Sequence, residues 1–271
     1  MTFPLKEVRN KDKMKKITKR VLIYFLLLML IAIDYPIIDR YIEESLDDYE
    51  IGVVERIVDG DTIIVNGSSV RLLGINTPEK GEVYYEEAKK FLNETIHGEV
   101  VRLRMGKEDT DLYGRKLRYV FLEERNINLE IVGGGYANFY FPSGKDKYYS
   151  DFKKAWLKCL DSNKGICEKS YGNCSLCVEL RELDVENQEI LIGNKCDFTC
   201  KLDGWTIKDE GRKKYTFENY TLDGELKIVV GKGDNTRSTL YWGQEDYVWT
   251  QKGDSLFIRD ENNKLVLWHS Y

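Results

Sequence analysis

The chain has 271 residues, which is enough for one or two domains with a buried core. Hydrophobic residues make up 42% and charged residues 32%, a balance that excludes a disordered polymer and favours a globular protein. The net charge is −5, and residues 50–170 carry 19 Lys and Arg against 20 Asp and Glu. This balance excludes a protein that holds nucleic acid by bulk positive charge.

The first 40 residues have the pattern of an export or anchor segment. Residues 1–20 contain eight Lys and Arg, and the thirteen residues 21–33 contain no charge. That length is short for a membrane span and typical of a signal-peptide core. No small-x-small cleavage site follows Ile33, so we favour an uncleaved anchor over a cleaved signal or a buried helix of a soluble protein. Anchor and signal both place the rest of the chain outside the membrane.

Residues 50–168 alternate between strand and helix patterns. Strands are expected at 51–57, 62–65 and 70–75, followed by a helix at 82–96, strands at 100–105 and 117–122, and helices at 127–132 and 147–163. Asn66-Gly67, between two β-rich runs, predicts a tight hairpin. This order predicts a mainly β domain with helices, a five-stranded barrel of the oligonucleotide-binding (OB) type.

Residues 176–271 have a different pattern, because helical periodicity is absent and short β-rich runs alternate with turn residues. The regular spacing predicts a second domain, a β-sandwich, with the boundary near 168–176. The expected strands are 189–192, 205–207, 215–217, 226–230, 240–242, 247–249, 255–258 and 265–268. We expect Trp205, Trp242 and Trp249 to lie in its core.

The six cysteines lie close together in the sequence, at Cys159, Cys167, Cys174, Cys177, Cys196 and Cys200. An even number in an exported chain favours disulfides. Cys174-x-x-Cys177 and Cys196-x-x-x-Cys200 also approach the spacing of a zinc ribbon. We therefore expect disulfides, with a four-cysteine zinc site as the alternative and no pairing assigned.

Polar residues stand at the strand ends of the predicted barrel, where a barrel presents functional groups. Asp61 and the side-chain oxygen of Asn76 are hard ligands for calcium, and the backbone carbonyl of Thr77 can add a third. Glu79 can orient or deprotonate a water molecule. These residue types predict a calcium site beside a general base.

Two arginines accompany this set. Arg71 lies inside a strand run, where it needs a partner, and Arg115 precedes a later strand. Each guanidinium can hold a phosphate by two hydrogen bonds and stabilise the charge that grows in a transition state. Each fragment alone also fits a turn, a helix start or a surface ion pair. Together they predict hydrolysis of a phosphodiester.

Three blocks carry a family resemblance: 58–62 (VDGDT), 71–79 (RLLGINTPE) and 110–115 (TDLYGR). They resemble the signature blocks of staphylococcal-nuclease-like (thermonuclease) domains, and the likeness covers about 50–168. The resemblance implies cleavage of DNA and RNA that leaves 3′-phosphates. By resemblance, Asp61, Asn76 and Thr77 are the calcium ligands, Arg71 and Arg115 hold the phosphate, Glu79 acts on the attacking water, and Asp59 supports the ligands from behind.

Asn76 departs from the family pattern, which has Asp at this position. An amide keeps the oxygen but loses a negative charge, so we predict weaker calcium affinity and not abolished binding.

The second domain resembles the lamin-tail domain, an immunoglobulin-like β-sandwich. The likeness rests on 203–207 (DGWTI), 241–243 (YWG), 248–249 (VW) and 253–256 (GDSL) with Asp260. It implies binding or positioning and no catalytic residue.

We therefore expect three parts: a basic N-terminus with an anchor helix at 1–40, a nuclease domain at 50–168 and a lamin-tail-like domain at 176–271. The expected protein is a calcium-dependent nuclease without a small-molecule cofactor, acting on DNA, RNA or both. It would be a single-pass protein of the cell membrane with its C-terminal domains outside, or secreted. The alternative is a non-catalytic OB-fold module that binds nucleic acid or a protein partner at the cell surface.

Overall fold

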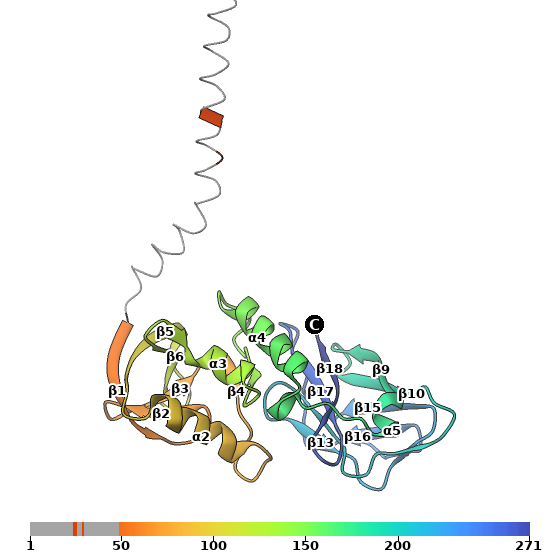
Figure 1. Cartoon of the computed structure of the whole chain (residues 1–271). Coiled ribbons are helices and arrows are strands. Elements are labelled where there is room, and N and C mark those ends of the chain that lie inside the picture. The colour runs from red at the N-terminus through yellow and green to blue at the C-terminus, as the bar shows by residue number, and fades with distance from the viewer. Residues whose placement is uncertain (1–23, 26–28, 30–48) are drawn as a thin grey trace, which may run out of the picture. The chain divides into compact units, whose positions relative to one another are not determined.

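The computed structural model describes residues 24, 25, 29 and 49–271 (Figure 1). The chain divides into two units, residues 1–48 and 49–271. The expected anchor or signal helix at 1–40 lies almost wholly outside the described residues. Within the described part of the chain, no helix has the length and apolar character needed to cross a membrane.

Five strands of the second unit form a closed barrel. Their order is β3-β2-β1-β5-β6, and a parallel pairing of β3 with β6 closes the ring. The predicted five-stranded barrel is therefore confirmed. The strands are β1 (Tyr49–Ile57), β2 (Thr62–Val65), β3 (Ser68–Leu72), β5 (Val100–Thr110) and β6 (Lys116–Leu122), with β7 (Arg125–Asn126) paired to β6.

The turn between β2 and β3 fixes the register of these two strands, which carry residues of the candidate site. Asn66 and Gly67 both have positive φ, 46° and 74°, as a two-residue hairpin of this kind requires. The register then sets Thr62 opposite Arg71. Asp61, one residue before Thr62, is thus brought beside the side chain of Arg71.

Helices and two short strands complete the barrel domain. They are β4 (Ile75–Asn76), α2 (Tyr85–Ile96), α3 (Ile127–Gly133), β8 (Asn138–Phe139) and α4 (Tyr149–Ser162). The three expected helices are found, but α2 begins three residues later than predicted. The reason is a turn before it, in which the Glu82 side chain accepts a hydrogen bond from the Glu79 N–H and Tyr84 takes a left-handed φ of 72°.

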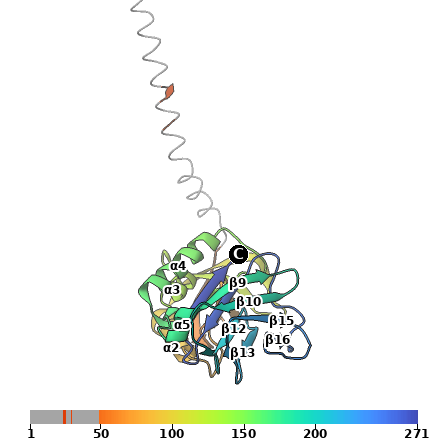
Figure 2. The ribbon, with the colours of Figure 1, turned by 90° about the vertical axis from the view of Figure 1, so that its right-hand side faces the viewer.

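The C-terminal part, which Figure 2 turns toward the viewer, contains two four-stranded sheets. Their orders are β16-β15-β10-β9 and β13-β12-β17-β18, and one buried apolar cluster draws residues from both. Trp205, Trp242 and Trp249 lie in this core, as predicted. The elements are η1 (Gly165–Cys167), α5 (Asn173–Cys177), β9 (Val178–Asp184), β10 (Glu189–Asn194), β11 (Cys200–Lys201), β12 (Thr206–Lys208), β13 (Lys214–Thr216), β14 (Thr221–Leu222), β15 (Glu225–Val230), β16 (Thr239–Trp242), β17 (Ser255–Arg259) and β18 (Leu265–Ser270).

One predicted strand, 247–249, is wrong. The backbone N–H groups of Val248 and Trp249 donate to the side-chain oxygen of Gln188, at 2.6 and 2.9 Å. A side chain thus supplies the acceptor that a neighbouring strand would have offered. The apolar pattern of the segment reflects burial of Val248 and Trp249, not sheet pairing.

An aromatic cluster joins the two domains across one continuous apolar contact. Trp156 of α4 is fully buried, and its ring lies edge-on to Phe257 and Trp268, with centroid distances of 5.6 and 6.0 Å. In Figure 1, α4 runs beside β17 and β18. Because Phe257 belongs to the same buried cluster as the barrel core, the domains are packed against each other.

All six cysteines form disulfides, Cys159–Cys167, Cys174–Cys200 and Cys177–Cys196. The expected disulfides are confirmed, and no cysteine is left for zinc. Two of the bonds tie the short helix α5 to β11 and to the loop before it.

Candidate active site

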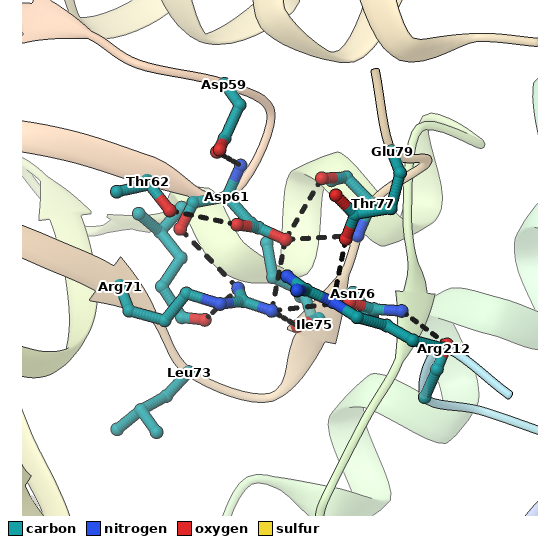
Figure 3. A network of polar contacts seen from close by, with 12 residues as sticks. Asp59, Asp61, Thr62, Arg71, Leu73, Ile75, Asn76, Thr77, Glu79 and Arg212 are labelled. Carbon is teal, nitrogen blue, oxygen red and sulfur yellow. Dashed lines mark hydrogen bonds and ion pairs between the residues drawn. The ribbon is translucent and has the colours of Figure 1, made fainter. Parts of the chain in front are cut away.

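Figure 3 shows the predicted site residues other than Arg115 in one group: Asp61, Arg71, Asn76, Thr77 and Glu79. Asp61 lies in the turn between β1 and β2, Arg71 in β3 and Asn76 in β4, while Thr77 and Glu79 follow β4. Each therefore stands on or next to a strand that the barrel core fixes.

Asp61 and Arg71 form a buried ion pair. The distance between Asp61 Oδ2 and Arg71 Nη2 is 3.0 Å, and the two side chains are 5% and 8% exposed. Arg71 also donates to the carbonyls of Leu72 and Ile75, at 2.9 and 3.0 Å. Asp61 is thus the partner that Arg71 needs inside a strand. Backbone carbonyl oxygens accept further hydrogen bonds from the Arg71 guanidinium.

Thr77 holds the Asp61 carboxylate from the other side. Its hydroxyl and its backbone N–H both donate to Asp61 Oδ2, at 3.0 and 3.3 Å. Thr62 donates to the second carboxylate oxygen at 3.1 Å. The carboxylate is therefore held in place by donors on both of its oxygens.

Asn76 is buried and uses both ends of its amide. Its Oδ1 accepts from Arg71 Nη2 at 3.4 Å, and its Nδ2 donates to the carbonyl of Gly211 at 2.7 Å. Gly211 belongs to the C-terminal domain, in the turn between β12 and β13. An ionised Asp at this position would have no hydrogen to donate to that carbonyl. The contact with Gly211 therefore explains why the residue is Asn and not Asp.

Asp59 lies behind Asp61 and accepts its backbone N–H at 3.0 Å. Burial and then repulsion from Asp61 raise the pKa of Asp59. Burial also lowers the pKa of Arg71; the neighbouring Arg115 and Arg212 act in the same direction, while Asp61 and Asp59 oppose it. The site therefore concentrates charges of both signs in a small volume.

Arg115 is oriented by Asp111, whose carboxylate accepts from Arg115 Nε at 2.7 Å. Burial acts against ionisation of Asp111, but hydrogen bonds from the backbone and side chain of Arg115 lower its pKa. Arg115 Nη1 also reaches the Thr62 hydroxyl at 3.4 Å. Because Thr62 donates to Asp61, Arg115 and Asp61 belong to one network.

Glu79 is half exposed, and its carboxylate pairs with Arg212 of the C-terminal domain, with Nε and Oε1 2.7 Å apart. Figure 3 shows Arg212 extending from that domain into the group of site residues. The sequence did not identify Arg212, which lies in a run of charged residues far from the signature blocks.

A cavity of about 370 Å³ opens beside the ion pairs. Arg71 and Arg115 line it together with Leu73, Tyr113 and Tyr140, while Asp61, Asn76, Thr77 and Glu79 lie outside its lining. Apolar walls with a few charged groups are typical of sites for small organic groups. The arginines thus connect the carboxylate network with a space of suitable size for one nucleotide.

Two of the expected metal ligands, Asp61 and Asn76, lie close to each other. Asp61 Oδ2 and Asn76 Oδ1 both lie against the same Arg71 nitrogen, so they converge on a point that already carries positive charge. Among the described residues, no group of three or more His, Cys, Asp or Glu side chains is placed to hold a metal ion. The ligand set expected from the sequence is one carboxylate, one amide and a backbone carbonyl, which are types that calcium accepts.

Three buried carboxyl groups lie in the turn that carries Gly211 or against it. Burial and then Asp254 raise the pKa of Asp209 to about 7 and that of Glu210 to about 8. Burial also raises the pKa of Asp254. Glu210 accepts from the Phe141 N–H at 3.1 Å and from the Ser255 hydroxyl at 3.3 Å, so these groups lie within the domain contact.

Two family models match the chain. The model described as "Staphylococcal nuclease homologue" matches residues 69–168, and that described as "Lamin Tail Domain" matches residues 178–271.

Similar proteins include the thermonuclease of Staphylococcus intermedius, which is 34% identical over 168 residues that cover 58% of this chain and 100% of that protein. The thermonuclease of Staphylococcus hyicus is 32% identical over 42% of this chain and 73% of its own length. Endonuclease YhcR of Bacillus subtilis is 32% identical over 44% of this chain, but the match spans only 11% of that protein. With this coverage and the geometry above, the chain belongs to the staphylococcal nuclease family and carries a lamin-tail domain at its C-terminal end.

Proposed function

We propose that the chain is a calcium-dependent endonuclease that hydrolyses DNA, RNA or both and leaves 3′-phosphates. The observation that carries the proposal is the single network of Asp61, Arg71 and Arg115, with Glu79 beside it. The names of the relatives, thermonuclease and endonuclease, support the same activity.

In the proposed reaction, Asp61, Asn76 and the Thr77 carbonyl would hold calcium, which would partly neutralise the negative charge of the phosphodiester. Arg71 and Arg115 line the cavity and can bind two oxygens of one phosphate. Because charge grows on that phosphate in the transition state, their guanidinium groups stabilise it more than the ground state. Glu79, half exposed at the edge of the network, orients or deprotonates the attacking water.

The activity test uses the full-length chain with plasmid, single-stranded DNA and RNA, in calcium and in chelator. We expect Arg71→Ala, Arg115→Ala and Glu79→Gln each to lower kcat by about 100-fold or more, as removal of one transition-state contact does. Arg125→Ala is the control, because Arg125 is an exposed arginine paired with Glu130 away from the site. A phosphatase-sensitive mobility shift of a labelled fragment would identify the 3′-phosphate.

Retained oligonucleotide binding by an inert wild type, in calcium as in chelator, would favour the non-catalytic binding module instead. Equal activity of the three site variants and the control would refute the assigned roles.

We also propose that the protein acts outside the cytoplasmic membrane, held by an anchor within residues 1–40 or released after cleavage. Three disulfides support this location, since such bonds persist in oxidising compartments. Protease added to intact cells would degrade an external domain and spare an internal one.

The two packed sheets also support an immunoglobulin-like arrangement of the C-terminal domain.

A further inference from the structure

The C-terminal domain reaches the candidate active site through one hairpin. Strands β12 and β13 pair, and the turn between them, residues 209–213, carries Arg212. The turn is closed by hydrogen bonds between Asp209 and Lys213, from the Asp209 N–H to the Lys213 carbonyl and from the Lys213 N–H to the Asp209 carboxylate. The turn is therefore closed by hydrogen bonds of its own, in addition to its contacts with the barrel.

Two asparagines of the barrel hold the tip of this hairpin. Asn76 and Asn138 are partners in the short pairing of β4 with β8, so their side chains lie close together. Asn76 Nδ2 donates to the Gly211 carbonyl at 2.7 Å, and Asn138 Nδ2 donates to the Glu210 carbonyl at 2.8 Å. Both amides are buried, so the residue that follows, Arg212, starts from a fixed backbone position.

The charge that the hairpin presents to solvent is positive, although its domain is acidic. Residues 171–271 carry 13 Lys and Arg against 18 Asp and Glu. Between Lys208 and Lys214, however, four cations stand against Asp209 and Glu210, and both of these carboxyl groups are buried. Of these cations, Arg212 is exposed beside Glu79, whereas Lys214 pairs with Glu82.

The contact between Arg212 and Glu79 is easily exchanged. The two side chains are 59% and 49% exposed, and an ion pair in such a position contributes little to stability. A phosphodiester carries one negative charge, as a carboxylate does, and offers the guanidinium two oxygens in the bidentate geometry that arginine binds, so it can replace Glu79 as the partner of Arg212. Figure 3 shows Arg212 among the labelled site residues, which include Arg71 and Glu79.

We propose that Arg212 is a third phosphate-binding arginine, supplied by the lamin-tail domain, that binds the phosphate next to the scissile one. The proposal rests on the nuclease function proposed above. It gives the C-terminal domain a direct part in substrate binding and makes Asn76 and Asn138 the residues that position Arg212. Nucleic acid with several phosphates gains from this contact, whereas a substrate with one phosphodiester does not.

The kinetic test compares the full-length wild type with Arg212→Ala and Arg212→Lys on two substrates in calcium. One is a dinucleotide with a single phosphodiester, and the other is a single-stranded DNA of ten nucleotides. For Arg212→Ala we expect KM on the longer substrate to rise about tenfold with kcat little changed, as loss of one charge-assisted contact does. The dinucleotide should show no change, and Arg212→Lys should recover part of the loss.

A binding test in chelator separates this proposal from the proposed function. The slope of log affinity against log salt concentration for the ten-nucleotide DNA should become shallower by about 0.7 in Arg212→Ala, the value for one phosphate contact on a single strand. The binding measurement tests Arg212 even if the wild type fails to cleave. A failure to cleave would refute the nuclease function alone. If wild type cleaves but Arg212→Ala keeps its KM and salt slope, the third arginine is refuted.

Two control variants separate loss of the Arg212 contact from a loosened hairpin and from a general loss of positive charge. Lys214→Ala breaks the neighbouring pair with Glu82, at 2.7 Å, and tests whether loosening the hairpin is enough to raise KM. Arg237→Ala removes an exposed cation next to β16, in the other sheet of the same domain. Neither control should change KM or the salt slope. An increase of kcat in Arg212→Ala on both substrates would overturn the proposal, because it would show that Arg212 restrains Glu79.

Discussion

Replacement of Asn76 by Asp tests two roles of this residue, its hydrogen bond to the C-terminal domain and its proposed part in binding calcium. The amide donates to the Gly211 carbonyl at 2.7 Å in a buried position, and a carboxylate would instead face that carbonyl with a second oxygen. Leaving a buried acceptor without its donor costs about 1–3 kcal/mol. Since 1 kcal/mol shifts the Tm of a protein of this size by about 2–4 °C, we expect a Tm about 2–12 °C lower in chelator.

The same substitution should strengthen calcium binding. A second carboxylate adds a negative charge to the donor set of Asp61 and Thr77, and we expect the affinity to rise by at least about tenfold. Thermal unfolding of the full-length chain in chelator and across a calcium titration measures both effects. The Tm difference between wild type and Asn76→Asp should narrow as calcium is added.

Asn138→Asp provides the matched control. It loses donors to the carbonyls of Glu210 and Phe139, both at 2.8 Å, but adds no ligand to the proposed metal site. Its Tm should fall in chelator and remain low in calcium, with unchanged calcium affinity. The reasoning is refuted if Asn76→Asp keeps the wild-type Tm in chelator, or if the two variants respond to calcium alike.

Three further predictions concern the domain contact and the crosslinks. Because the pKa of Glu210 is raised to about 8, the folded state binds more protons than the unfolded state, and stability should fall as pH rises from about 4.5 to 8. The raised pKa values of Asp209 and Asp254 act in the same direction, so Glu210→Gln should reduce the fall of Tm over that range without abolishing it. Trp156→Ala should lower the unfolding free energy by about 3–5 kcal/mol in a denaturant titration, and a cost below about 1 kcal/mol would contradict its place in the joint core. Reduction of the disulfides should lower Tm by several degrees, since each bond restricts the unfolded chain, and Cys174–Cys200 closes the longest loop.

Much of the barrel was predictable because its signals are local. Apolar alternation and the Asn66-Gly67 turn fix strands and register over a few residues, and the three signature blocks fall on the strands and turns so defined. The strand β9 escaped prediction because charged residues such as Glu179, Arg181 and Glu182 obscure its alternation. The segment 247–249 was predicted wrongly because burial alone resembles a strand pattern.

The contribution of the second domain to the site could not be predicted, since it depends on contacts between distant segments. Nothing near Arg212 in the sequence indicates Glu79 as its partner, and Asn76 looks in the sequence like a weakened metal ligand. Its bond to Gly211 is visible only when the domains are packed together. The pairing of the cysteines likewise depends on the position of α5 in the fold.

The hairpin tip is held through main-chain oxygens, and this has a consequence for how freely its sequence can vary. Carbonyl groups are common to all amino acids, so exchange of Arg212 or Lys213 leaves the anchoring bonds intact. Gly211 is the exception, because a β-carbon there would stand 3.0 Å from Asp209 and 3.4 Å from Tyr140. Saturation mutagenesis of the tip should therefore return many folded variants with altered catalysis, but few folded variants with a larger side chain at Gly211. The turn is thus a suitable place to engineer substrate preference.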